Sequence, residues 1–317
     1  MINEFIKSKG KAKSFIFLYK YEMYLIIGAN GYVGAYTIKN ILEKTTENII
    51  AVDKKIDLVN KNDRVLWVQC DITNHEDIVN LNKLVTNKSE TVKIIYLAAY
   101  HAPDQVLANP KIAWNINITA LSDFLNTLDN VQCLFYSSTE MVYAPGNLST
   151  KFNEDALKQP INAYGKNKVL AEALVLGRGY NVVRFPFLIG KSILKEKKHF
   201  YDIIVETICG GKTIEMFKDA YKTALDFDTA TKVLVDLAER YSHEMPTVLN
   251  ISGDEVISKY EIGLRIAQKY NCSSDLIVPI SMHEDNTIFT AERADCILLD
   301  NSCVKKVLEL DEIKLQL

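Results

Sequence analysis

The chain has 317 residues, enough for one large α/β domain or for a core domain with a smaller lobe. Its 48% hydrophobic and 24% charged residues are typical of a globular protein, and a formal net charge of −3 gives no electrostatic reason to expect nucleic acid or an anionic membrane as a partner. Neither the six cysteines nor the five histidines show the spacing of metal ligands, so we expect the protein to bind no metal. We also expect the cysteines to be reduced thiols and the protein to be cytoplasmic.

The first 22 residues differ from the rest of the chain. Four lysines between positions 7 and 13 precede an apolar patch at 15–19, which is too short to span a bilayer and has no cleavage site after it. We expect residues 1–22 to be an extension that folding does not require, translated from a misplaced start codon. An additional packed helix is the alternative.

Residues 23–27 form an apolar run that stops at a glycine, and two more glycines follow at intervals of three. The run is typical of a buried parallel strand, and apolar residues recur behind it at helical spacing. The first free N–H groups of such a helix suit a phosphate, and glycine lets a pyrophosphate approach the backbone. The sequence therefore predicts a dinucleotide-binding turn, with contacts from Gly28, Asn30, Gly31, Tyr32, Val33 and Gly34.

An acidic residue ends the next predicted strand, at 47–53. Asp53 lies nineteen positions beyond Gly34, where a carboxylate can accept hydrogen bonds from the hydroxyls of the adenosine ribose. The same charge would repel the 2′-phosphate of NADP, so the sequence favours NAD as the cofactor. Lys54 and Lys55 follow directly and leave NADP as the alternative, because an ammonium there can neutralise an extra phosphate.

Two more strands and a long helix are predicted before residue 130. A strand at 64–70 is followed by Asp71, which either binds the adenine amino group or caps the next helix. A strand at 92–99 ends in small residues, which would let a cofactor pass close to the backbone. Residues 113–121 belong to a helix that we expect to run to about residue 128.

Polar residues with catalytic potential follow the fifth predicted strand, at 131–136. The hydroxyl cluster at 137–139 lies at the carboxyl end of this strand, where ligands collect in an open parallel sheet. Further on, Tyr164 and Lys168 lie four apart and share one face of a predicted helix. Of the sixteen tyrosines, only Tyr164 has a lysine four positions later.

Between residues 23 and 305, these motifs in this order resemble the extended short-chain dehydrogenases/reductases that act as sugar-nucleotide epimerases, dehydratases and reductases. The resemblance implies that the cofactor contacts extend to Asp71, Ile72, Leu97, Ala98, Ala99, Asn115, Tyr164 and Lys168. Further matching positions are the hydroxyl cluster at 137–139, Arg184, 250–253, 258–261, Arg293 and 299–302.

The resemblance also implies a reaction, hydride transfer at a sugar carbon. Tyr164 would exchange a proton with the substrate oxygen, although a free phenol has a pKa near 10. Lys168, which would also hold the nicotinamide ribose, would lower that pKa together with the nicotinamide charge. Thr139 would hydrogen-bond the reacting oxygen. The catalytic residues are therefore expected to be Thr139, Tyr164 and Lys168.

Three departures from the family pattern narrow the reaction. Glu140 is followed by Met141, where dehydratases have Asp-Glu, and a thioether cannot remove a proton. Phe187 stands where an asparagine is usual, which is similar to the dTDP-4-dehydrorhamnose reductase branch. The usual Arg-Asp-Phe is missing, and Lys222 is the candidate replacement for its phosphate contact, without the bidentate geometry of arginine. The expected substrate contacts are Thr139, Glu140, Phe187, Lys222 and Arg293.

A lysine-rich segment at 191–199 occupies the position where the family binds the substrate diphosphate. The interpretation that we favour for it is a solvated loop. We expect a doubly wound parallel sheet built by 23–190 and 221–252, with a smaller substrate lobe from 191–220 and 253–317 and the ligand cleft between them.

The predicted protein is an NAD(P)-dependent oxidoreductase acting on a nucleotide-activated sugar, either a 4-ketosugar reductase or a C4 epimerase. Asp53 favours NAD and hence an epimerase that recycles its cofactor, whereas Phe187 and the segment around Arg293 favour a reductase. The alternative is a cofactor-binding regulatory or scaffold subunit without turnover. The resemblance implies a homodimer.

Overall fold

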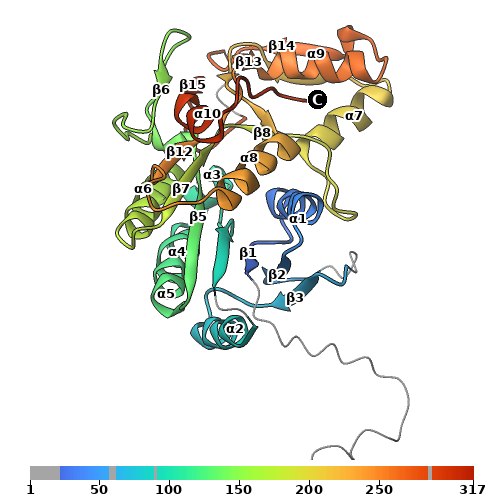
Figure 1. The fold of residues 1–317 in the computed structure, drawn as a ribbon. Coiled ribbons are helices and arrows are strands. Elements are labelled where there is room, and N and C mark those ends of the chain that lie inside the picture. The colour runs from blue at the N-terminus through green and yellow to red at the C-terminus, as the bar shows by residue number, and fades with distance from the viewer. Residues whose placement is uncertain (1–21, 57–61, 89–90, 285–287) are drawn as a thin grey trace, which may run out of the picture.

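A seven-stranded parallel sheet forms the centre of the molecule (Figure 1). The computed structural model describes residues 22–56, 62–88, 91–284 and 288–317, so the predictions for residues 1–21 lie outside the described part. The strand order is β12-β7-β5-β4-β1-β2-β3, in which the chain winds outward from β1 in both directions. The strands are β1 (Met23–Ile27), β2 (Asn48–Asp53), β3 (Val65–Gln69), β4 (Val92–Tyr96), β5 (Val131–Thr139), β7 (Asn181–Phe185) and β12 (Val248–Asn250). The predicted doubly wound sheet is confirmed.

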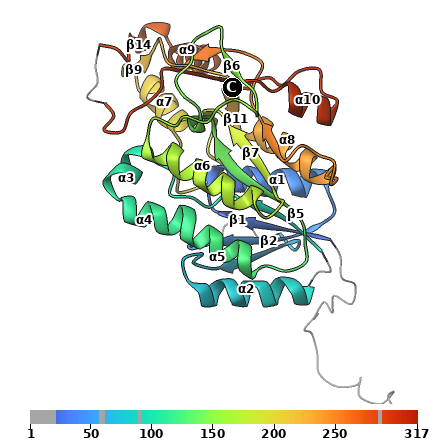
Figure 2. The same ribbon diagram turned by 90° about the vertical axis from the view of Figure 1, so that its left-hand side faces the viewer.

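Helices cover both faces of this sheet, and β1 contributes side chains to both of the resulting cores. Tyr24 and Ile26 pack on one side, against α1 (Tyr32–Lys44) and α8 (Phe227–Glu239). Leu25 and its neighbours pack on the other side, which is covered by α2 (His75–Lys88), α5 (Ala120–Thr127) and α6 (Ala163–Leu176) (Figure 2). This double burial explains why β1 is apolar throughout, without the alternation of a half-exposed strand.

The helix predicted to reach residue 128 contains an irregular turn. It begins as α4 (Pro110–Trp114), passes through a π-helical turn at Asn115–Thr119 and continues as α5. Turns of this kind are frequent at functional sites, because the extra residue changes the direction in which side chains project. Asn115, at the start of the turn, is one of the predicted cofactor contacts.

A smaller region lies above the carboxyl ends of the central strands (Figure 1). Its buried core is built mainly by isoleucines from three separate segments of the chain. Its sheets are β13-β10-β15-β6, β11-β8 and β14-β9. The strands are β6 (Lys151–Phe152), β8 (Leu188–Ile189), β9 (Ile214–Phe217), β10 (Tyr221–Lys222), β11 (Leu225–Asp226), β13 (Ile257–Ser258), β14 (Ile277–Ile280) and β15 (Cys296–Leu299). The remaining helices are α3 (Pro103–Ala108), α7 (Phe200–Cys209), α9 (Lys259–Lys269) and α10 (Ser302–Leu308), with 3₁₀ turns at Glu140–Val142 and Ser274–Leu276.

Two segments are shared between the regions. β10 pairs with β13 and β15 in the smaller region, although we predicted that the central domain resumes at residue 221. In the opposite direction, α10 returns to the central core, where Val304 and Leu308 are buried. The division of the chain into two lobes therefore stays a prediction. No helix in the described part of the chain combines the length and apolar character needed to cross a membrane.

Candidate active site

The turn between β1 and α1 requires glycine at two positions. Gly28 has a φ of +89°, and a Cβ atom there would stand 2.8 Å from the backbone nitrogen of Ala98. A Cβ atom on Gly34 would stand 2.5 Å from the carbonyl oxygen of Gly28. The first glycine therefore lets the chain turn closely past β4, and the second lets α1 pack against the turn.

A cavity of about 530 Å³ opens beside this turn, along the carboxyl ends of β1, β2 and β4. Its wall of glycines, small residues and two carboxylates has the composition predicted for a dinucleotide site. Ten of the predicted cofactor contacts line it: Gly28, Asn30, Gly31, Asp53, Asp71, Ile72, Leu97, Ala98, Ala99 and Asn115. Tyr32, Val33 and Gly34 are not among the lining residues; they begin α1 behind the turn.

The two carboxylates of this cavity are held in different ways. Asp53 Oδ2 accepts a hydrogen bond of 2.9 Å from the backbone N–H of Asn30, so the end of β2 is tied to the glycine turn. Asp71 accepts from both the N–H and the hydroxyl of Thr73, at 3.0 and 2.7 Å, and pairs with Lys54 at 2.7 Å. The alternative in which Asp71 caps the next helix is wrong, because the Asn74 side chain accepts from the first turn of α2.

A second cavity, of about 320 Å³, lies between the central sheet and the smaller region. Thr139 at the end of β5 and Tyr164 in the first turn of α6 both line it. Also in its wall are the predicted substrate contacts Glu140, Phe187, Lys222 and Arg293. His101, which follows β4, lines this cavity and the first one, so the two cavities meet at its side chain.

Lys168 stands behind the second cavity. Its ammonium donates hydrogen bonds to the carbonyl oxygen of Ser137 at 2.6 Å and to the Tyr136 hydroxyl at 3.0 Å, and lies 5.8 Å from the centre of the Tyr164 ring. Burial lowers the pKa of Lys168 to about 7, and burial raises the pKa of Tyr164. We predicted that the lysine lowers the pKa of the phenol; in this structure desolvation has the larger effect.

Charged residues of the second cavity are mostly paired. Lys222 Nζ lies 3.1 Å from Glu140 Oε1, and both side chains are buried. Arg293 Nη2 lies 2.7 Å from Asp104 Oδ2 on α3, which ties the segment after residue 288 to the central domain. Within the residues that the structure describes, no group of three or more His, Cys, Asp or Glu side chains is arranged to hold a metal.

Comparison with known sequences decides the family. The sequence profile of the RmlD substrate-binding domain family matches residues 22–314. The chain belongs to this family. The resemblance to the extended short-chain dehydrogenases/reductases, which include it, is thereby confirmed.

One relative is a subunit of a larger enzyme. The β subunit of methionine adenosyltransferase 2 from Xenopus laevis is 28% identical over 195 residues, which make up 59% of this chain and 57% of that protein. This chain thus aligns with less than two thirds of that relative's length.

Two solved structures share the fold of this RmlD-family chain. A hypothetical dTDP-4-dehydrorhamnose reductase from Sulfolobus tokodaii has a TM-score of 0.74 at 21% identity, covering 93% of this chain and 97% of that one. A UDP-glucuronic acid 4-epimerase from Bacillus cereus, in complex with UDP-glucuronic acid and NAD, has a TM-score of 0.76 at 16% identity, covering 94% and 95%.

The lysine-rich segment lies against the glycine turn. Lys197 Nζ donates to the carbonyl oxygen of Asn30 at 2.6 Å and lines the first cavity, whereas no residue of 191–199 lines the second. Tyr32 and Tyr36 on α1 donate from their hydroxyls to the carbonyl oxygens of Lys198 and Lys191, at 2.8 and 2.9 Å. The segment has no regular secondary structure and most of its residues are exposed, as the solvated-loop interpretation predicts.

Two cavity residues were missed by sequence analysis, and a third residue supports the site. His101 has a signal in the sequence, since it follows the small residues at the end of β4. Lys259 lines the second cavity from α9; it lies within the family match at 258–261, which assigned it no role. Asn117, buried in the π-helical turn, exchanges two hydrogen bonds with the backbone of Tyr100 and so fixes the loop that carries His101.

Proposed function

We propose that this protein is an NAD(P)-dependent oxidoreductase that acts on a nucleotide-activated sugar, as a 4-ketosugar reductase in preference to a C4 epimerase. One observation carries the proposal. Tyr164 and Thr139 face a cavity that meets the glycine-turn cavity at His101, so a reactive group held at the end of the first cavity would reach the phenol in the second.

The first cavity fits a dinucleotide. At the turn, Gly28 and Gly31 line the cavity without side chains that would hold a pyrophosphate away from the backbone. Asp53 would accept hydrogen bonds from the adenosine ribose, which supports NAD, and Lys54 is neutralised by Asp71 rather than free for a 2′-phosphate. When bound, the nicotinamide supplies hydride chemistry. The epimerase from Bacillus cereus, which shares the fold, was crystallised with NAD.

Tyr164 is the proposed proton donor. Because burial raises its pKa above the ordinary value near 10, the phenol is protonated at neutral pH and can give its proton to a ketone oxygen. Thr139 would donate a hydrogen bond to the same oxygen. Lys168, anchored on Ser137, would hold the cofactor ribose beside the ring. Phe187 and Arg293, which favour a reductase in the comparison of motifs, both line the same cavity as Tyr164.

The experiment measures oxidation of NADH and NADPH with dTDP-4-keto-6-deoxysugars and UDP-4-ketosugars. A reductase consumes one equivalent of reduced cofactor, whereas an epimerase converts its substrate without net consumption. Tyr164→Phe is expected to lower kcat by roughly 10²- to 10⁴-fold without a change in NADH affinity. Tyr241→Phe, whose hydroxyl lies on the surface near His243, is the matched control and should keep full activity. Full activity of Tyr164→Phe would reject the assigned role.

The second candidate is a cofactor-binding subunit without turnover, and the relation to the β subunit of methionine adenosyltransferase 2 favours it. The side chains Thr139, Tyr164 and Lys168 support catalysis instead, because a relaxed site is expected to lose them first. NADH binding without turnover of any sugar nucleotide in the panel would favour the subunit. Whether the protein is a homodimer stays a prediction, which sedimentation velocity can test.

A further inference from the structure

Lys259 is an exception among the charged residues of the second cavity. Three cationic side chains and one carboxylate line this space. Lys222 pairs with Glu140, and Arg293 pairs with Asp104. Lys259, among the residues that the structure describes, has neither an ion pair nor a hydrogen bond from its ammonium, so the cavity carries an excess of positive charge.

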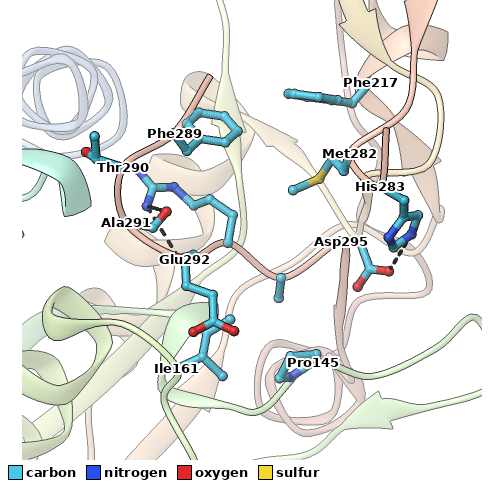
Figure 3. Close-up of a pocket in the computed structure, with 12 residues that line it drawn as sticks. Pro145, Ile161, Phe217, Met282, His283, Phe289, Thr290, Ala291, Glu292 and Asp295 are labelled. Carbon is cyan, nitrogen blue, oxygen red and sulfur yellow. Dashed lines mark hydrogen bonds and ion pairs between the residues drawn. The ribbon is translucent and has the colours of Figure 1, made fainter. Parts of the chain in front are cut away.

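Aromatic rings surround this ammonium. Lys259 Nζ lies 5.2 Å from the ring centre of Phe187, 5.6 Å from that of Phe289 and 5.8 Å from that of Phe217. Phe217 and Phe289 also line a neighbouring open cavity of about 480 Å³, which shares Met282 and Arg293 with the second cavity. Figure 3 shows Phe217, Phe289 and Met282 on one side of this neighbouring cavity, with Glu292 and Pro145 opposite them.

Ring faces attract a cation, but they do not replace the hydrogen bonds that three N–H groups lose when water is removed. Burial, together with the charges of Lys222 and Arg293, lowers the pKa of Lys259 to about 8, although the charge of Glu140 acts in the opposite direction. The chain therefore keeps a cation where burial and two neighbouring cations outweigh one carboxylate. An anion in the cavity would remove this penalty, because it would supply both the opposite charge and the acceptor atoms.

The backbone holds Lys259 in a fixed position. It is the first residue of α9, directly after Ser258, whose side chain accepts a 3.2 Å hydrogen bond from the backbone N–H of Glu261. Glu261 in turn accepts a 2.7 Å hydrogen bond from the N–H of Ser258. This capping box fixes the start of the helix, so the lysine reaches the cavity from a rigid element.

We propose that Lys259 binds an oxyanion of the substrate in the cavity that Tyr164 lines. The ligand chemistry is a phosphate of a nucleoside diphosphate or a carboxylate of a sugar acid. That the ligand is the substrate rests on the proposed function. The inference assigns the specificity of this site to a lysine for which the family match at 258–261 implied no role. It would also compensate for Phe187, which replaces a polar side chain at the position expected to contact the diphosphate.

The test is calorimetric titration of the full chain with inorganic pyrophosphate and, separately, with glucuronate. Lys259→Met keeps an unbranched side chain among the three rings, one atom shorter than lysine, and removes its charge, whereas Lys259→Arg keeps the charge. We expect Lys259→Met to weaken binding of the preferred anion at least tenfold and Lys259→Arg to weaken it less than threefold. Preference for pyrophosphate would identify the phosphate source, and preference for glucuronate the carboxylate source.

Lys197→Met is the matched control, because Lys197 lies at the glycine turn, where pyrophosphate could also bind. Loss of binding in Lys197→Met but not in Lys259→Met would overturn the inference, as would unchanged affinity in Lys259→Met or no binding of either anion to the wild type. A melting temperature of Lys259→Met at or above that of the wild type shows that folding is intact. A separate result would reject the proposed function alone. In that case the protein would turn over no ketosugar, while anion binding would still depend on Lys259.

Discussion

The guanidinium of Arg184 binds the carboxylate of Glu172 through two hydrogen bonds, Nε to Oε1 at 2.9 Å and Nη2 to Oε2 at 2.8 Å, and both side chains are buried. The hydroxyl of Ser138 donates a third bond, of 2.6 Å, to the same carboxylate. Glu172 lies on α6, the helix that carries Tyr164, whereas its two partners lie on β7 and β5. The pair therefore fixes the position of the phenol relative to the sheet.

Replacing Glu172 is expected to destabilise the protein strongly. Glu172→Gln keeps the shape of the side chain but leaves the Arg184 charge buried without a counter-charge, which costs about 3–5 kcal/mol in the free energy of unfolding. Urea denaturation followed by circular dichroism measures this value. Glu255→Gln is the matched control, because Glu255 also makes a two-point pair with an arginine, Arg265, but at the surface. There we expect a loss of less than about 1 kcal/mol, and equal losses in the two variants would contradict the prediction.

The same pair predicts how stability depends on acid. Burial alone would raise the pKa of Glu172, but the hydrogen bonds and charge of Arg184 outweigh it, so the pKa lies below its ordinary value. Because this pKa is lower in the folded protein than in the unfolded chain, the ionised carboxylate stabilises the fold fully above about pH 4.3, the value for an exposed glutamate. This stabilisation is lost as the pH falls through the folded-state pKa. The difference in unfolding free energy between the wild type and Glu172→Gln should therefore shrink below pH 4. A difference that stays constant to pH 2 would contradict this account.

The central sheet was predictable because most of its strands, unlike β3 at its edge, are buried on both faces. Such strands are continuous apolar runs, and each predicted strand of residues 23–136 overlaps an observed one. The short strands of the smaller region lacked this signal. β10 has two residues, and its place beside β15 depends on a pairing between segments more than seventy positions apart, which local sequence does not encode.

The site was predictable where a backbone constraint or a fixed spacing marks it. Glycine at 28 and 34 and the spacing of Tyr164 and Lys168 are signals of this kind. Lys259 gave no such signal, because a lysine that begins a helix is ordinary until the fold surrounds it with three phenylalanines. The charge of the lysine-rich segment predicted a solvated loop, but its place beside the glycine turn depends on tyrosine hydroxyls on α1, which the charge pattern does not reveal.

Lys168 should give the protein a pH dependence on the alkaline side. Its folded-state pKa is about 7 because of burial, whereas a lysine in an unfolded chain titrates near 10.4. The fold therefore disfavours the charged form, and the resulting penalty is complete below about pH 7 and disappears as the pH rises towards 10.4. Relative to Lys168→Met, the wild type should gain stability between pH 7 and 10. Urea denaturation of both proteins at four pH values measures this gain, and parallel curves would reject it.

Asp53 should set the choice between the two nicotinamide cofactors. Its carboxylate lines the first cavity and accepts a hydrogen bond from the Asn30 backbone, which the amide oxygen of Asp53→Asn can also accept. The variant thus removes the charge without removing the contact. We expect the preference for NADH over NADPH to fall about tenfold, or about 1.4 kcal/mol, as measured by fluorescence titration. An unchanged ratio of the two dissociation constants would show that the carboxylate does not face the ribose.

Cys209 and Cys272 should form a disulfide under mild oxidation. Their sulfur atoms lie 3.6 Å apart, at the end of α7 and just after α9, and neither side chain is buried. The bond would close a loop between residues 63 positions apart, which on chain-entropy grounds would stabilise the fold by about 4 kcal/mol. Treatment with oxidised glutathione should therefore raise the melting temperature of the wild type but not that of Cys209→Ser, and peptide mapping should find the linked pair. If both thiols still react with iodoacetamide after oxidation, the side chains do not approach closely enough in solution.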